Sequence, residues 1–280
     1  MQDLGQELTG FVITVGDEPN FRECTQRLQE QTVDFQLKII RNVAPMSEAF
    51  NEMHRRCTTL TFVQVDEDML LFPTALERLY SALAKAPPQV AAIVAPLWDV
   101  QVERPIYGVK IARTEVARRF PYRNVMSCEI DHNQNLNDAG FEIISLPLEW
   151  SQGECFGLHG KHYTAETAFL RWRRMFQKRR RTGRPLWAAP WPARFLDRYR
   201  RTGSEVDLFS FLGAVSAMSG EDPADREHDH RERGEDFRRI REALEVDRIG
   251  RESAREVGES ARSSIGRWAI LAKRWFRSRT

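Results

Sequence analysis

The chain has 280 residues, 41% of them hydrophobic, and a formal net charge of +2, a composition typical of a soluble globular protein that does not bind polyanions along its whole length. Its four cysteines are widely spaced and form no CxxC pair, which excludes the common zinc-site spacing and predicts free thiols. The N-terminus lacks a signal-peptide pattern, and no apolar run reaches the roughly 18 residues of a membrane span, so we expect a cytoplasmic protein.

Short apolar segments alternate with amphipathic patterns in the first hundred residues. Strands are predicted at residues 10–15, 35–43, 59–65 and 90–96 because these segments are rich in β-branched and aromatic side chains. Helices are predicted at 21–31, 47–57 and 73–83, with Ser47 as an N-cap. This order indicates an α/β fold with a mostly parallel sheet and helices on both faces.

The third predicted strand ends on three consecutive carboxylates, Asp66, Glu67 and Asp68. In an open α/β sheet, ligands bind at the carboxyl ends of strands. Carboxylates at that position suit a hard divalent cation, which in turn binds phosphate oxygens. The alternative is an acidic turn that faces solvent.

The pattern changes after Trp98. Residues 106–113 alternate as an antiparallel strand does, and residues 127–139 form a polar helical pattern that ends at a glycine. Another strand is predicted at 141–147, and a loop rich in glycine and histidine follows at 150–164. Trp98 and Asp99 follow the fourth predicted strand at its carboxyl end. An exposed Trp with an adjacent carboxylate suits the face of a sugar, and the alternative is that Trp98 packs in the core.

Four motifs together resemble the nucleotide-sugar glycosyltransferases with the GT-A fold, of the family-2 kind. They are a strand with a polar loop after it (Thr14 to Asn20), the helix AFNEMHRRC that carries Asn51, the strand and D-x-D motif TFVQVDEDM, and the segment CEIDHNQNLNDAGFEIISLP. The resemblance covers residues 10–163. It implies a GT-A, Rossmann-like fold and a Mn²⁺ or Mg²⁺ ion that binds the diphosphate of the donor.

The resemblance also implies roles for individual residues. Asp68 is expected to bind the metal directly, with His159 or His162 as a second ligand and Lys161 near the pyrophosphate; the alternative is that both histidines lie at the surface or in packing. Contacts with the nucleotide sugar are expected from Thr14, Val15, Asp17, Glu18, Asn42, Asn51, Asp66, Glu67 and Trp98.

The acceptor hydroxyl needs a base if the anomeric carbon is inverted. Glu129 and Asp131 are the candidates, and His132 lies beside them; the alternative is that these acids only favour a helix N-terminus. The segment IIRNVAP lacks the acidic turn usual in the family. Asp17 or Glu18 could replace that acid, or Arg41 could contact a phosphate. The sequence therefore does not determine which nucleotide the donor carries.

The C-terminal third is charge-rich. Residues 171–184 form a dense basic cluster that suits anionic lipid, a phosphate-bearing acceptor, nucleic acid or a solvated helix face. Residues 208–218 predict a short apolar helix, and residues 237–249 a narrow helical stripe that could pair with another chain. Residues 263–280 have the pattern of a basic amphipathic helix that lies in a membrane interface or docks on protein.

The predicted organisation is therefore a GT-A domain over residues 1–200, with a nucleotide half at about 1–100 and an acceptor half at about 101–200, followed by a helical, charge-rich extension over 201–280. The expected function is metal-dependent transfer of a sugar from a nucleotide diphosphate to a glycan or lipid-linked acceptor. The alternatives are a non-catalytic or nucleotidyltransferase-like α/β protein and an anion- or membrane-binding module. Expected partners are the donor, the acceptor, an anionic membrane surface at the inner face of the membrane and a second copy of the chain, but no nucleic acid.

Overall fold

The computed structural model of the chain describes residues 2–16, 19–182, 190–219, 226 and 235–244. The described residues divide into two compact units, residues 2–162 with Arg226 in the first and the described residues from Tyr163 on, apart from Arg226, in the second. The predicted domain of residues 1–200 therefore includes the first helices of the second unit.

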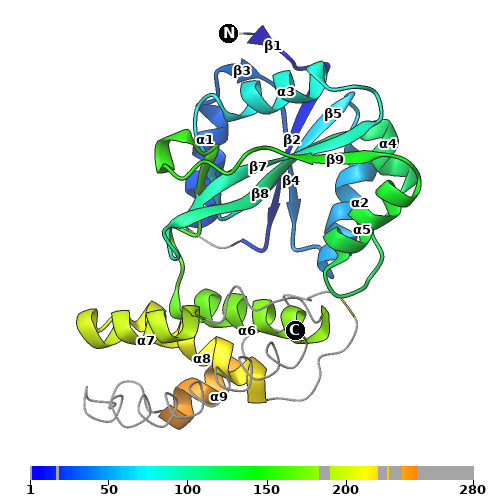
Figure 1. Cartoon of the computed structure of the whole chain (residues 1–280). Coiled ribbons are helices and arrows are strands. Elements are labelled where there is room, and N and C mark those ends of the chain that lie inside the picture. The colour runs from blue at the N-terminus through cyan, green and yellow to red at the C-terminus, as the bar shows by residue number, and fades with distance from the viewer. Residues whose placement is uncertain (1, 17–18, 183–189, 220–225, 227–234, 245–280) are drawn as a thin grey trace, which may run out of the picture. The chain divides into compact units, whose positions relative to one another are not determined.

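The first unit is built on one mixed sheet whose strand order is β4-β2-β5-β8-β7-β10-β6, with β9 also paired to β7 (Figure 1). Its strands are β2 (Leu8–Thr14), β4 (Gln36–Arg41), β5 (Thr61–Asp66), β6 (Met69–Leu71), β7 (Val90–Asp99), β8 (Arg104–Arg113), β9 (Glu142–Ser145) and β10 (Gly157–His159). Only β6 and β8 run against the rest of the described sheet. A small parallel pair, β1 (Gln2–Asp3) and β3 (Val33–Asp34), lies apart from it.

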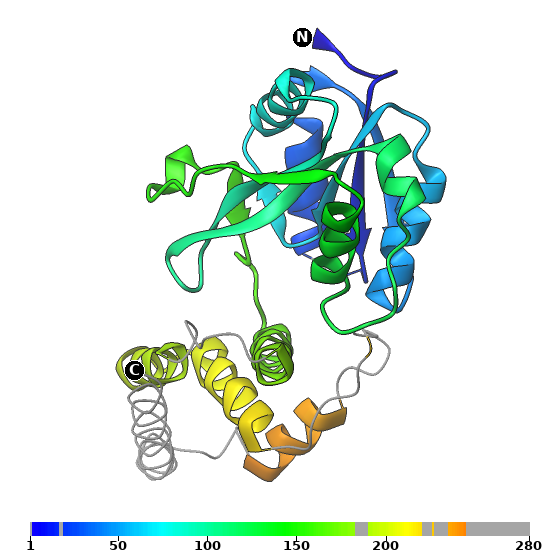
Figure 2. The same cartoon turned by 45° about the vertical axis from the view of Figure 1, so that its right-hand side comes forward.

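Helices cover both faces of this sheet, as Figures 1 and 2 show. They are α1 (Asn20–Gln29), α2 (Met46–Arg56), α3 (Ala75–Lys85), α4 (Thr114–Arg119) and α5 (Cys128–Asp138). Alternate residues of a strand point to opposite faces. Val63 and Val65 of β5 accordingly join the core under α1 and α3, whereas Phe62 joins a second core with Met53 of α2 and Ala117 of α4.

The predicted α/β fold with a mostly parallel sheet flanked by helices is confirmed. The antiparallel strand predicted at residues 106–113 is present as β8, and it lies between β5 and β7 in the sheet. One local prediction differs from the structure. Ser47 is not the N-cap of α2: the N-cap is Pro45, whose carbonyl accepts the first backbone N–H bonds, from Glu48 at 2.9 Å and Ala49 at 3.3 Å.

The shared strand direction brings several strand ends to one edge of the sheet. Strands β2, β4, β5, β7 and β10 run the same way, and they end at Thr14, Arg41, Asp66, Asp99 and His159. Residues far apart in the sequence therefore become neighbours at the edge where α/β proteins bind ligands.

The second unit is helical. Its described helices are α6 (Ala165–Thr182), α7 (Trp191–Thr202), α8 (Glu205–Ser219) and α9 (Glu235–Leu244). Helices α6 and α8 pack so closely that a Cβ added at Gly213 would lie 2.2 Å from the carbonyl oxygen of Phe169. Aromatic side chains fill the interior, with the Trp172 and Phe195 rings 4.6 Å apart and Phe209 against Phe237.

The apolar helix predicted at 208–218 is buried in this unit as part of α8, because Phe209, Phe211 and Ala214 are almost inaccessible to solvent. None of the described helices combines the length and apolar character needed to cross a membrane. The predicted basic helix at residues 263–280 lies outside the described residues.

Candidate active site

Asp68 and His159 meet at the carboxyl edge of the sheet. Asp68 follows β5 and precedes β6, and His159 ends β10, which pairs antiparallel with β6. The Nε2 atom of His159 lies 3.4 Å from Oδ2 of Asp68, and the two side chains are 14% and 23% exposed. A backbone bond from the Gly160 N–H to the Asp68 carbonyl, 3.0 Å long, holds the two segments together. The structure thus pairs a carboxylate with an imidazole, both partly open to solvent.

Asp99 contacts the other side of the same imidazole. Its Oδ2 lies 3.0 Å from Nδ1 of His159, and its side chain is completely buried. The second carboxylate oxygen accepts the backbone N–H groups of Gln101 at 3.1 Å and Val102 at 3.0 Å. His159 is therefore placed between two carboxylates, one buried and one at the surface.

Glu67 ties the acidic triplet to the loop after β2. Its carboxylate accepts hydrogen bonds from the Thr14 hydroxyl and, at 3.4 Å, from the Val15 N–H. The Gly16 N–H in turn donates to the Thr14 hydroxyl oxygen over 2.7 Å. Thr14, Val15 and Glu67, all expected to contact the donor, thus form one hydrogen-bonded group that shapes the first loop.

Asp66, the first acid of the triplet, is partly buried. Burial, reinforced by the negative charges of Asp68 and Glu129, raises its pKa to about 8. Its Oδ1 atom is buried and has no hydrogen-bond partner among the described residues. A buried carboxylate oxygen without a donor carries a desolvation cost that a cation or a ligand hydroxyl would relieve.

Glu129, on the first turn of α5, faces the same region as Asp66. Gln64 Nε2 donates to its Oε1 over 3.4 Å, and the ammonium of Lys110 lies 3.8 Å from the same atom. Lys110 is buried and donates to the Tyr122 hydroxyl at 2.7 Å. Strands β5 and β8 place Gln64 directly opposite Lys110. Glu129 is nevertheless half exposed, so its carboxylate remains accessible.

Asp131 is engaged differently. The guanidinium of Arg123 binds both of its carboxylate oxygens, with Nε 2.8 Å from Oδ2, and Asn135 Nδ2 donates to Oδ2 over 3.3 Å. Its neighbour His132 is buried and stacks on the Tyr122 ring at 4.0 Å. Burial, together with the positive charge of Lys110, lowers the pKa of His132 to about 3, which keeps it neutral. Of the two candidates for a base, Glu129 has the carboxylate less committed to an ion pair.

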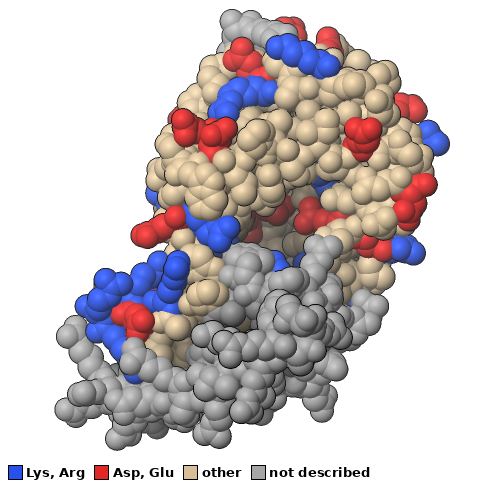
Figure 3. Space-filling model, viewed as in Figure 1, with Lys and Arg blue, Asp and Glu red and all other residues tan. Residues whose placement is uncertain are grey.

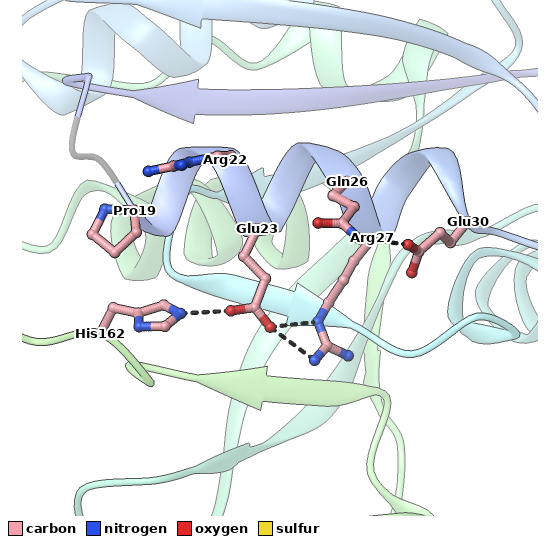
Figure 4. A pocket seen from close by; sticks show the side chains of 7 residues that line it. All are labelled: Pro19, Arg22, Glu23, Gln26, Arg27, Glu30 and His162. Carbon is pink, nitrogen blue, oxygen red and sulfur yellow. Dashed lines mark hydrogen bonds and ion pairs between the residues drawn. The ribbon is translucent and has the colours of Figure 1, made fainter.

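His162 lies away from Asp68, against helix α1. Its Nε2 is 2.5 Å from a carboxylate oxygen of Glu23, and Lys161 Nζ lies 2.9 Å from both oxygens of Glu23. Burial raises the pKa of Glu23, but hydrogen bonds from His162, Lys161 and Arg27 outweigh it and lower that pKa to about 2. Figure 4 shows His162 and Arg27 on either side of Glu23, in a pocket along α1. The structure therefore brings His159, not His162, to the acidic triplet.

The remaining predicted donor residues lie as follows. Both groups of the Asn51 amide bind the backbone of Tyr122, with Nδ2 2.9 Å from its carbonyl oxygen and Oδ1 2.8 Å from its nitrogen. Asn42 has a positive φ of 56° and donates its N–H to the Thr14 carbonyl over 2.9 Å, beside the first loop. Trp98 is half-buried and packs against the main core. Asp17 and Glu18 lie outside the described residues.

Two residues of this region, Lys110 and Glu23, were not predicted as part of the site from the sequence. Asp99 was expected at the end of the fourth predicted strand, as a carboxylate beside Trp98, but its contact with His159 was not predicted. Lys110 sits in a strand and Glu23 in a helix, and neither position carries a local sequence signal. No three His, Cys, Asp or Glu side chains group as a metal site within the described ranges. Of the three predicted metal ligands, Asp68 and His159 lie side by side.

Comparisons with known proteins found similar solved structures but no related sequence. It matches no protein-family model and no curated protein sequence. Among solved structures, it is similar to the mannosyltransferase PcManGT from Pyrobaculum calidifontis in complex with GDP-Man and Mn²⁺, with 14% identity, 78% of this chain and 76% of that chain covered, and a TM-score of 0.48. That neighbour is a mannosyltransferase, an enzyme of the class that the sequence motifs resemble.

Two nucleotidyltransferases are similar over a smaller part. The 4-diphosphocytidyl-2C-methyl-D-erythritolsynthase from Anaerococcus prevotii DSM 20548 has 7% identity and a TM-score of 0.38, covering 53% of this chain and 89% of that one. The CMP:2-keto-3-deoxy-manno-octonic acid synthetase complexed with CTP has 10% identity and a TM-score of 0.35, covering 50% of this chain and 89% of that one. These likenesses concern the fold alone.

Proposed function

We propose that the protein is a metal-dependent glycosyltransferase that transfers a sugar from a nucleotide diphosphate to a glycan or lipid-linked acceptor. The observation that carries the proposal is the pair Asp68 and His159, which come from different strands and meet 3.4 Å apart at the ligand-binding edge of the sheet. Donor atoms that share one cation at about 2.1 Å lie about 3 Å apart when they are neighbours in an octahedron. The separation in the structure is close to that value.

The donor set suits Mn²⁺ or Mg²⁺. Carboxylate and imidazole together are ligands that Mn²⁺ accepts, and such ions usually complete their shell with water and substrate phosphates. When bound, the cation would neutralise the charge that develops on the leaving diphosphate. Glu67 bonds Thr14 and Val15 of the loop after β2, and this link to the triplet supports the proposal that both residues contact the nucleotide beside the diphosphate.

Glu129 is the residue proposed to remove the proton from the acceptor hydroxyl if the reaction inverts the anomeric carbon. Its carboxylate is held by Gln64 and faces the ammonium of Lys110, both on adjacent strands of the rigid sheet. A base must be held within reach of the proton that it accepts, and Gln64 and Lys110 restrict the positions of Glu129. Asp131 is ion-paired with Arg123 and is proposed to position the start of α5 instead.

The test is thermal melting of the full chain with Mn²⁺ and each of a panel of nucleoside diphosphates. We expect a stabilisation that needs both the metal and one nucleotide, because binding to the native state raises its stability. Products are then separated from reactions with the matching sugar nucleotide. Release of a nucleoside diphosphate from the sugar nucleotide supports glycosyl transfer. A parallel reaction contains a nucleoside triphosphate, and release of pyrophosphate there would identify a nucleotidyltransferase. No stabilisation with any pair would overturn the proposal.

We further propose that the second unit associates with an anionic membrane surface as a peripheral protein. Residues 163–219 contain 12 Lys and Arg and four Asp and Glu, a net charge of +8. Residues 1–162 contain 15 Lys and Arg and 22 Asp and Glu, a net charge of −7. In Figure 3, basic side chains gather where α7 lies in Figure 1. Basic residues near anionic lipid contribute about 1 kcal/mol each.

Flotation with liposomes tests this association. The chain should float with vesicles that contain phosphatidylserine and not with pure phosphatidylcholine, and high salt should release it. The double variant Arg194→Glu, Arg201→Glu, both exposed on α7, should bind less, while Lys85→Glu, Arg119→Glu on the first unit should not change binding. Equal binding of the two double variants to the vesicles would exclude α7 as the membrane-binding surface. A chain that ends at residue 262 shows whether the basic tail contributes to membrane binding.

A further inference from the structure

The completely buried carboxylate of Asp99 contacts His159 on the side opposite to Asp68. We infer that Asp99 is a positioning residue: it selects the tautomer of His159 whose unprotonated Nε2 faces Asp68, and so prepares the imidazole to bind a cation. The inference rests on the proposed cation site and adds to it a residue that makes no contact with the ion.

The backbone holds Asp99 in place. One carboxylate oxygen accepts the N–H groups of Gln101 and Val102, at 3.1 and 3.0 Å, in the turn that follows β7. Those two bonds fix the carboxylate group, and the other oxygen, Oδ2, is left 3.0 Å from Nδ1 of His159. Hydrogen bonds from two backbone N–H groups to this carboxylate favour its ionised form.

An ionised carboxylate accepts hydrogen bonds and donates none. The ring nitrogen that faces Asp99 must therefore carry a proton, which makes Nδ1 the protonated atom of a neutral His159. The lone pair is then on Nε2, 3.4 Å from the Asp68 carboxylate. A lone pair and a carboxylate repel each other unless a positive charge lies between them, so this tautomer presents two donors to one cation. A carboxylate or carbonyl commonly orients metal-binding histidines in this way.

Strand pairing limits how far the ring can move. His159 is directly opposite Asp99 in the parallel pair β10–β7, and the Val100 N–H donates to the His159 carbonyl over 3.0 Å. On its other side, β10 pairs with β6, which begins one residue after Asp68. The three side chains are thus aligned by neighbouring strands.

The protonation of His159 can be read directly. The full chain is labelled with ¹⁵N, long-range ¹H–¹⁵N spectra of the histidine rings are recorded with and without saturating Mg²⁺, and the variant His159→Gln assigns the ring. We expect a neutral ring protonated on Nδ1 in the Mg²⁺-saturated protein. A neutral ring protonated on Nε2 would overturn the inference alone. A ring that carries both protons with or without Mg²⁺ would overturn the cation site and the inference with it.

Metal affinity supplies the second measurement. Mn²⁺ binding is measured by calorimetry for the wild-type chain, Asp99→Asn and the exposed control Asp138→Asn. Loss of an orienting carboxylate typically weakens metal binding 10- to 100-fold, so we expect that range for Asp99→Asn and no change for the control. An Asn side chain can also donate a hydrogen bond to Nδ1. In Asp99→Asn, the spectrum of the His159 ring should therefore no longer show the tautomer protonated on Nδ1 alone. Wild-type affinity and an unchanged ring spectrum in Asp99→Asn would overturn the role of Asp99 while leaving the proposed function intact.

Discussion

The hydroxyl of Thr14, at the end of β2, donates a hydrogen bond to the carboxylate of Glu67, the middle residue of the acidic triplet after β5. Strands β2 and β5 pair in parallel, and the Glu67 N–H also donates to the Ile13 carbonyl over 3.1 Å. The loop that is proposed to contact the nucleotide is therefore coupled to the segment that is proposed to bind the metal.

Replacing Thr14 by valine should weaken nucleotide binding with little effect on the cation. The change removes a hydrogen bond to a charged group, worth about 1.5–3 kcal/mol, so the dissociation constant for the nucleoside diphosphate should rise about tenfold or more. Calorimetry in saturating Mn²⁺ checks the value, with the exposed Thr58→Val as control. If Thr14→Val binds as tightly as the wild type, Glu67 does not act through the first loop.

The variant Asp68→Ala should lose transfer activity by at least about 100-fold, because one of the two proposed cation ligands is removed. Its Mn²⁺-dependent stabilisation should also disappear. The side chain is partly exposed, so the melting temperature without metal should change little. Rates and melting curves of Asp68→Ala are compared with those of Asp138→Ala, an exposed acid outside the site. Full activity in Asp68→Ala would exclude the metal assignment.

Glu129 and Asp131 can be separated by isosteric amides. Glu129→Gln should lower kcat about 100- to 10,000-fold, the range of general-base catalysis, without changing nucleotide binding. Asp131→Asn should weaken the Arg123 ion pair and lower kcat less than tenfold. Initial rates with the acceptor that the product assay identifies decide between them. If Asp131→Asn lowers kcat more than Glu129→Gln does, Asp131 is the base. Full activity in both variants would indicate that neither residue acts as the base.

The elements of the first unit could be predicted from local patterns, because β-branched runs and amphipathic stripes act over a few residues. The position of Asp66, Glu67 and Asp68 at a strand end followed from the same patterns. Strand pairing is not local, so the insertion of β8 between β5 and β7 could not be derived.

Side-chain orientation was the other limit. The sequence placed Glu129 and Asp131 two residues apart on one helix, and only the structure shows that Arg123 binds one and Lys110 faces the other. The same holds for His159 and His162, which contact Asp68 and Glu23 respectively. Each choice depends on a partner more than five residues away.

Glu23 should make stability depend on pH in the acid range. Its pKa is about 2 in the folded protein against an ordinary value of 4.5, so its contribution is present above pH 4.5 and is lost as the pH falls from 4.5 to 2. The group is partly exposed, which limits the contribution to about 1 kcal/mol. Urea unfolding at pH 5 and pH 3 should show a smaller loss for Glu23→Gln than for the wild type. Glu30→Gln, which changes an exposed acid at the C-cap of the same helix, serves as control; equal losses in all three chains would contradict the prediction.

Gly157 should be required for the position of His159. A Cβ added at residue 157 would lie 2.4 Å from the carbonyl oxygen of Leu70, in the strand that pairs with β10. The backbone would have to move, at a cost of about 1–3 kcal/mol, and His159 lies only two residues further along the same short strand. We therefore expect Gly157→Ala to lower the melting temperature and to weaken Mn²⁺ binding.

The matched control for this strand is Gly153→Ala, because an added Cβ there meets no described atom within 4 Å. Its effect on stability should stay within about 0.5 kcal/mol, and its Mn²⁺ affinity should equal that of the wild type. Melting curves and calorimetry of the two variants separate the strand from the loop before it. If Gly157→Ala is destabilised but binds Mn²⁺ normally, the spacing of β10 and β6 does not set the metal site. Because Asp68 and His159 lie on segments joined by that strand pair, the expected result is that stability and affinity fall together.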